Sequence, residues 1–232
     1  GLALSLFAYG YGTLASEVER FVSEMAVIEE AIADIGGTVI DSWLAVVIMV
    51  LAVVSAVFAT LSALRVRAEE STGRAEPLLA TPVSRSAWLG SHLVVALAGS
   101  AMLMLGAGLG LGLGAAQALG DWAMLGRILG GALGHLPAIW VVAGAGIALF
   151  GMAPRLIPLV WVVVAYAGLV GWLGTLLRFP EWAIDLSPMG HTPLLPAEGM
   201  VWTPLAVLVA AATALVLAGM AAFRRRDLQS MA

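Results

Sequence analysis

The chain has 232 residues, of which 61% are hydrophobic and 11% are charged, and its formal net charge is −4. Soluble domains carry roughly 25% charged residues, so the composition excludes a soluble protein and indicates an all-α, polytopic membrane protein. Cysteine and lysine are both absent, which excludes disulfides, thiolate metal sites and a P-loop, since a P-loop requires a Gly-Lys-Ser/Thr sequence.

Apolar runs predict the membrane spans in chain order. Residues 1–16 form an incomplete run without an initiating Met, which we interpret as a first span cut short within a longer polypeptide. A helix needs about 20 residues to cross the hydrocarbon core. Five further runs reach that length: 42–64, 86–120, 123–154 (fully apolar from 128), 156–177 and 201–223. We therefore expect one transmembrane domain over 1–232.

Two segments between spans have recognisable patterns. In 17–41, apolar residues recur every three or four positions, which predicts an amphipathic helix on the membrane surface. An acidic vestibule for cationic substrates is the alternative there. In 178–200, repeated prolines prevent a continuous helix and tryptophans suit the membrane interface, so we expect a broken or re-entrant element.

Charge sets the orientation, because arginines concentrate beside spans on the cytoplasmic side. If 65–85 is cytoplasmic, alternation of the spans gives that side eight arginines and leaves three for the outside, together with eleven of the fifteen acids. The eight are Arg65, Arg67, Arg74, Arg85, Arg155, Arg224, Arg225 and Arg226. Residues 224–232 are then a cytoplasmic tail.

The run 86–120 contains two interleaved glycine rows. Gly106, Gly110 and Gly114 form one row, and Gly108 and Gly112 form the other, about 200° away around a helix. Both sides of this helix can therefore accept a close neighbour. Static packing is the simpler interpretation, and a sliding or hinge surface along a transport pathway is the alternative.

Other site chemistries have weak signals. His92, His135 and His191 lie in separate segments, so no metal site is predicted. Ser100 with His135 is the one pair that could serve an intramembrane serine-protease-like enzyme. The interiors of the spans contain no Asp, Glu, Arg or Lys, whereas ion-coupled carriers generally use intramembrane carboxylates. Both alternatives are therefore disfavoured, and we expect no catalytic residues.

Segment 65–85 is the one dense charge cluster between two long apolar runs. A generic solvated loop would also be charged. However, prolines fix the exit from a short helix, and a Leu pair beside carboxylates is suited to docking into a partner's groove. The candidate docking residues are Glu69, Glu70, Gly73, Arg74, Glu76, Pro77, Leu78, Leu79, Pro82 and Arg85.

The pattern Glu-Glu-x-x-Gly-Arg-x-Glu-x-Leu-Leu-x-x-Pro-Val-Ser-Arg resembles the coupling segment of type-2 ABC exporter permeases, and is closest to the actinobacterial tetronasin-type exporters of polyketide antibiotics. The resemblance runs from Leu44 to Leu228. It implies a six-helix domain with a short cytoplasmic coupling helix, corresponding to the C-terminal half of the permease.

The resemblance also implies partners and a location. ATP and Mg²⁺ would bind to two separate ABC ATP-binding subunits and not to this chain. The other six-helix half would lie on the same longer polypeptide, and the assembly would sit among lipids in the bacterial cell membrane. No nucleic acid is expected. The implied cargo is hydrophobic or amphiphilic, of the antibiotic or drug type.

Overall fold

The computed structural model describes residues 1–23, 39–71, 85–173 and 179–225, and the elements within these ranges are all helical. They are α1 (Leu2–Thr13), α2 (Ala15–Ser23), α4 (Val39–Ser71), α6 (Arg85–Leu119), α7 (Ala123–Gly134), α8 (Leu136–Met152), the 3₁₀ turn η1 (Pro154–Leu156), α9 (Leu159–Leu173), α10 (Glu181–Leu186), the 3₁₀ turn η2 (Pro188–His191) and α11 (Trp202–Arg225).

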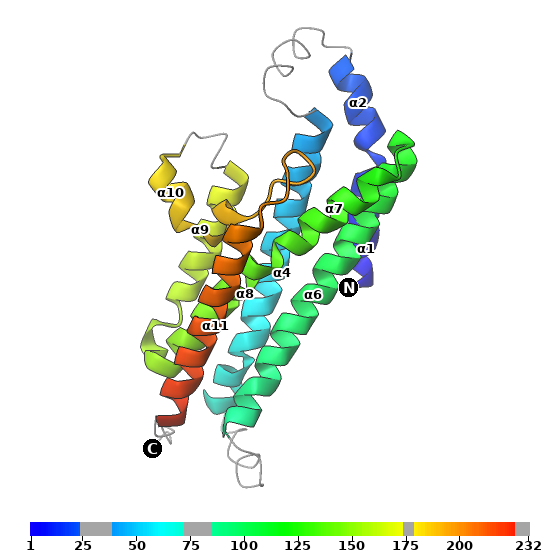
Figure 1. The fold of residues 1–232 in the computed structure, drawn as a ribbon. Helices are drawn as coiled ribbons and strands as arrows, with labels where there is room; N and C mark the ends of the chain where they lie inside the picture. The colour runs from blue at the N-terminus through cyan, green and yellow to red at the C-terminus, as the bar shows by residue number, and fades with distance from the viewer. Residues whose placement is uncertain (24–38, 72–84, 174–178, 226–232) are drawn as a thin grey trace.

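The long helices α4, α6, α8, α9 and α11 run side by side, and α7 crosses obliquely near one end (Figure 1). In the described ranges four stretches are long and apolar enough to span a membrane: Val39–Glu70, Ser86–Leu119, Ala123–Met152 and Trp202–Arg225. The apolar part of α9, Leu159–Gly171, is shorter. The predicted class, an all-α polytopic membrane protein, is confirmed.

The core lies where α4, α6, α7 and α8 meet. Ile48, Met104, Leu111, Ile128 and Ile139 are almost completely buried there, among many alanines. Small side chains allow helices to approach closely, and in a bilayer this packing has to replace the hydrophobic driving force that water provides. The hydroxyl of Ser55 is satisfied inside this core by the sulfur of Met104, at 3.2 Å.

Helices α8 and α11 approach each other closely. A Cβ added to Gly151 would collide with the carbonyl oxygen of Gly219, and one added to Gly219 would lie 2.9 Å from the Cα of Ala148. About two turns before Gly151, a Cβ on Gly144 would lie 3.2 Å from the carbonyl oxygen of Ala212. The two backbones therefore touch along several turns.

The helix boundaries differ from the expected spans in two places. Helix α4 continues past Leu64 to Ser71, so the first charged residues of 65–85 extend the span as helix. Arg and Glu are good helix formers, which accounts for this continuation. The expected span 123–154 is divided at His135 into α7 and α8, with Pro137 in the first turn of α8.

One end of the bundle is rich in arginine. The ends of α4 and α11 and the turn η1 lie there, and they carry Arg65, Arg67, Arg155, Arg224 and Arg225. Helix α4 ends and helix α6 begins at this same end. We call it the arginine-rich end, and it is at the bottom of Figure 1. Helices α2 and α10 lie at the opposite end. Of the outer segment 17–41, residues 24–38 lie outside the described residues.

Candidate functional site

The predicted docking residues divide into two groups. Glu69 and Glu70 lie in the last turns of α4, and Arg85 is the first residue of α6. The others fall outside the described residues: Gly73, Arg74, Glu76, Pro77, Leu78, Leu79 and Pro82. The structure thus shows the two helix ends that flank the candidate segment 72–84.

Glu69 joins these two helix ends directly. Its Oε2 accepts a hydrogen bond from the indole Nε1 of Trp88 at 3.1 Å and lies 3.2 Å from Nε2 of His92, and both of these partners come from α6. The carboxylate is only 30% exposed and the imidazole 15%. Hydrogen bonds to an ionised acceptor are stronger than those between neutral groups. The ends of α4 and α6 that flank segment 72–84 are therefore joined to each other at its base.

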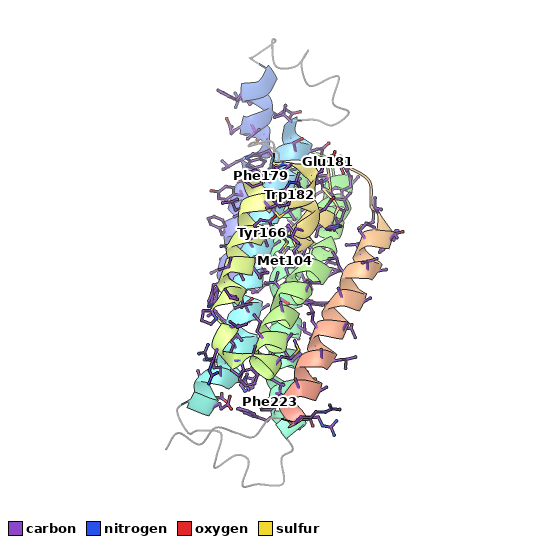
Figure 2. The ribbon with its side chains drawn as sticks, turned by 90° about the vertical axis from the view of Figure 1, so that its left-hand side faces the viewer. Met104, Tyr166, Phe179, Glu181, Trp182 and Phe223 are labelled. Carbon is purple, nitrogen blue, oxygen red and sulfur yellow. The ribbon has the colours of Figure 1, made fainter. Side chains whose placement is uncertain are left out.

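Aromatic rings extend this base to two further helices. The ring of Trp88 packs edge-on against His92 at 5.9 Å and lies 6.2 Å from that of Phe223 in α11. Phe223 in turn lies 5.2 Å from Phe150 in α8. Phe150 and Phe223 are fully buried, and Figure 2 places Phe223 at the arginine-rich end. We call Glu69, Trp88, His92, Phe150 and Phe223 the base cluster.

The glycine rows of α6 contact two different helices. The row of Gly106, Gly110 and Gly114 contacts α1, and a Cβ on Gly110 would collide with the carbonyl oxygen of Ser5. The row of Gly108 and Gly112 contacts α7, where a Cβ on Gly112 would lie 2.7 Å from Cδ1 of Leu125. Gly110 and Gly114 in the first row therefore meet backbone atoms of α1, whereas Gly106 meets the side chain of Ser5. In the second row the nearest atom to each glycine belongs to a side chain of α7.

A group of polar contacts around Arg127, at the end opposite the arginine-rich end, was not predicted from the sequence. Arg127 in α7 lies 3.4 Å from the carboxylate of Asp41 at the start of α4, and it donates a 2.6 Å hydrogen bond to the carbonyl of Pro196. In the same region, the hydroxyl of Tyr166 donates to the carbonyl of Ala183 in α10 at 2.6 Å. The sequence contained one signal for these contacts: Arg127 is the single charged residue in an otherwise apolar helix, and such a charge needs a polar partner.

The serine and histidine considered for catalysis are engaged elsewhere. The Ser100 hydroxyl donates to the carbonyl of Leu97 at 2.9 Å and accepts from Trp140 Nε1 at 3.3 Å. Nδ1 of His135 is hydrogen-bonded to the carbonyl oxygen of Gly131 at 2.8 Å. No hydrogen bond joins Ser100 to His135 in the described part of the chain. Within the same ranges, no cluster of three or more His, Asp or Glu side chains is placed to hold a metal ion.

Apolar helices crossing the bilayer several times, with charge confined to their ends, define a multi-pass cell membrane protein. The family model described as "Multidrug efflux system permease Rv1217c, C-terminal domain" matches residues 1–224, so this chain belongs to that family.

A curated relative agrees with the family model. The chain is similar to the multidrug efflux system permease protein Rv1217c of Mycobacterium tuberculosis (strain ATCC 25618 / H37Rv), at 35% identity over 232 residues. The match covers 98% of this chain and 42% of the relative, so the chain spans less than half of the relative's length. Membership of a permease family is consistent with a transport subunit and does not indicate an enzyme.

Proposed function

We propose that this chain is the C-terminal half of the permease of an ATP-driven exporter, and that it moves hydrophobic or amphiphilic compounds out of the cell. Two ABC ATP-binding subunits supply the energy, and ATP and Mg²⁺ bind to them. A second six-helix half completes the pathway. The narrower assignment, to polyketide-antibiotic exporters of the tetronasin type, is part of this proposal and rests on the sequence pattern of 69–85.

The observation that carries the proposal is the base cluster. A permease driven by a soluble ATPase needs a segment outside the bilayer to receive the push and a stiff connection to pass it on. Glu69 bonds to α6 from the end of α4, and the aromatic rings connect α6 to α11 and α8. A displacement of 72–84 would therefore reach four helices together.

The positions of the charges support an energy source outside the bilayer. Among the described residues, the long apolar helices carry acids only at their ends, as with Asp41 at the start of α4 and Glu69 near its end. A carrier driven by protons or sodium would need a carboxylate inside the span to bind and release its ion. An apolar path supplied with energy from outside the bilayer suits a hydrophobic cargo better.

Charge reversal in the docking segment tests the proposal. We expect Glu76→Arg and Leu78→Asp to weaken association with the ATP-binding subunits or to uncouple ATP hydrolysis from transport. Each places an unpaired charge in a docked surface, which costs several kcal/mol (about 3–5) when it is buried. Co-purification and substrate-stimulated ATP turnover are the measurements.

Glu198→Arg is the matched control, because it makes the same charge change on an exposed side chain at the opposite end. It should leave both assembly and coupling intact. Normal association and normal transport in both docking variants would contradict the proposal.

A further inference from the structure

A pocket opens between α4 and α9 at the arginine-rich end. Its volume is about 460 Å³, within the ~300–1,000 Å³ range of ligand sites. One wall is apolar and comes from Leu61 and Leu64 of α4 and from Ile157 and Trp161 beyond η1. Arg65, Arg67 and Ala68 complete the lining. The pocket thus combines a greasy wall with positive charge.

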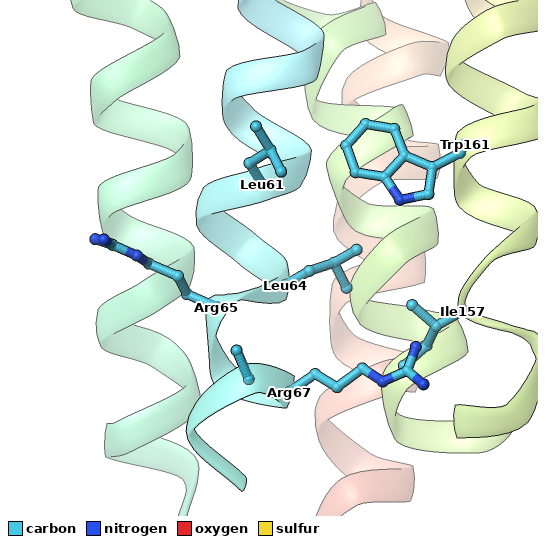
Figure 3. A pocket seen from close by; sticks show the side chains of 7 residues that line it. Leu61, Leu64, Arg65, Arg67, Ile157 and Trp161 are labelled. Carbon is cyan, nitrogen blue, oxygen red and sulfur yellow. The ribbon is translucent and has the colours of Figure 1, made fainter. Parts of the chain in front are cut away.

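The two arginines do not contribute equally. Figure 3 shows the Arg67 side chain extending toward Ile157, on the side of α4 where Trp161 lies, whereas the Arg65 side chain extends to the other side. Both arginines are exposed, and neither forms an ion pair with another residue in the described ranges. Arg67 therefore directs toward the apolar wall a positive charge that no described side chain compensates.

The pocket lies where the bilayer changes from hydrocarbon to head groups. The uncharged stretch of α4 from 42 to 64 would be about 34 Å long at 1.5 Å per residue, which matches a hydrocarbon core of ~30 Å. Arg67 then lies among the head groups, and Trp161 lies at the interface, where tryptophan is enriched. Leu61 and Trp161 are 54% and 39% exposed, and Leu159 and Val162 beside Trp161 are also exposed, so this face offers apolar surface to acyl chains.

We propose that this pocket binds an anionic phospholipid of the adjacent leaflet. The phosphate lies at Arg67, and the part of an acyl chain nearest the head group lies along Leu61, Leu64 and Trp161. Guanidinium groups match phosphate oxygens in charge and in hydrogen-bond geometry. Basic pockets between spans at the head-group level are suited to anionic lipid heads. A soluble partner could reach the arginine but not the apolar wall, which faces the bilayer. The inference does not depend on the proposed cargo or on the ATPase.

Quenching of Trp161 fluorescence tests this in the intact protein. The protein is reconstituted in phosphatidylcholine bilayers with a fixed fraction of chain-brominated lipid, bearing either a phosphatidylglycerol or a phosphatidylcholine head. Subtracting the signal of a Trp161→Phe variant isolates the Trp161 component. We expect the brominated phosphatidylglycerol to quench with about fivefold higher apparent affinity, the preference expected from one arginine near an anionic head group.

Variants at the two arginines separate a site from general surface charge. Arg67→Gln should abolish the preference, Arg67→Lys should keep much of it, and the matched control Arg65→Gln should leave most of it. Equal quenching by the two lipids in the unsubstituted protein would overturn the proposal without any variant. Equal losses in Arg67→Gln and Arg65→Gln would also overturn it, because they would indicate diffuse attraction.

Discussion

Glu69 combines a contact between two helices with a predicted docking role. The sequence suggests a docking residue, whereas the structure directs its Oε2 inward to Trp88 and His92. The two roles are compatible, because a carboxylate has two oxygens with several acceptor positions. What the structure adds is a connection between the two helix ends that flank 72–84.

Replacing Glu69 measures the strength of that connection. We expect Glu69→Leu to lower the free energy of unfolding by about 1–2 kcal/mol, because it removes the acceptor and leaves the buried Trp88 and the largely buried His92 without it. Glu69→Gln keeps an acceptor oxygen and should lose less. Unfolding in a detergent titration gives the stabilities. Equal stability of the Leu variant and the unsubstituted protein would show that the contact does not hold α4 to α6.

At the scale of the element, α6 is the helix that most depends on having no side chain at particular positions. Gly110 meets the backbone of α1, which cannot move aside locally. The atom nearest to a Cβ on Gly112 is the end of the Leu125 side chain, which can rotate, and the Leu125 backbone is farther away at 3.3 Å. The same substitution should therefore have different costs at the two positions. Whether either face also slides during transport stays a prediction.

Alanine at three glycines of α6 tests this difference. Gly110→Ala should destabilise the protein by about 1–3 kcal/mol through overpacking. At Gly112, a smaller clash is offset by the helix propensity of alanine, ~1 kcal/mol over glycine, so the net change should be small. Gly90 has open space around it and serves as the control, where alanine should stabilise. Unfolding free energies are compared across the set, and equal costs at positions 110 and 112 would contradict the assignment of neighbours.

The elements show what a sequence can and cannot determine here. Long uncharged runs can be recognised directly in the sequence, because charged residues are costly in a bilayer and are therefore absent from contiguous stretches of the chain. The all-α class follows from these runs. The division at His135 was missed because apolar residues continue through it, although Pro137 is typical of a helix start. The bond from Glu69 to Trp88 could not be predicted, because it depends on how two helices are rotated and offset along their axes.

At the scale of the whole molecule, orientation remains a prediction from the arginine count, and the cysteine-free chain makes it easy to test. Single cysteines at exposed positions should react with a membrane-impermeant maleimide from one side only. Arg155→Cys should be labelled from the cytoplasm, and Asp185→Cys from outside. Ser187 would have been a natural choice from the sequence, but it is buried. Labelling from the reversed sides would overturn the orientation.

The contact between α1 and α6 has a consequence for biosynthesis. The hydroxyl of Tyr9 donates to Oε1 of Gln117, 108 residues away, and the backbone of α1 lies against the glycines between them. At ~5–20 residues per second, a ribosome needs roughly 5–20 seconds to make the stretch that separates the two helices. During that interval α1 is without its partner. A chaperone or insertase that shelters unpaired helices would therefore act on α1 over this period, and would retain it longer in a variant whose α6 cannot accept it.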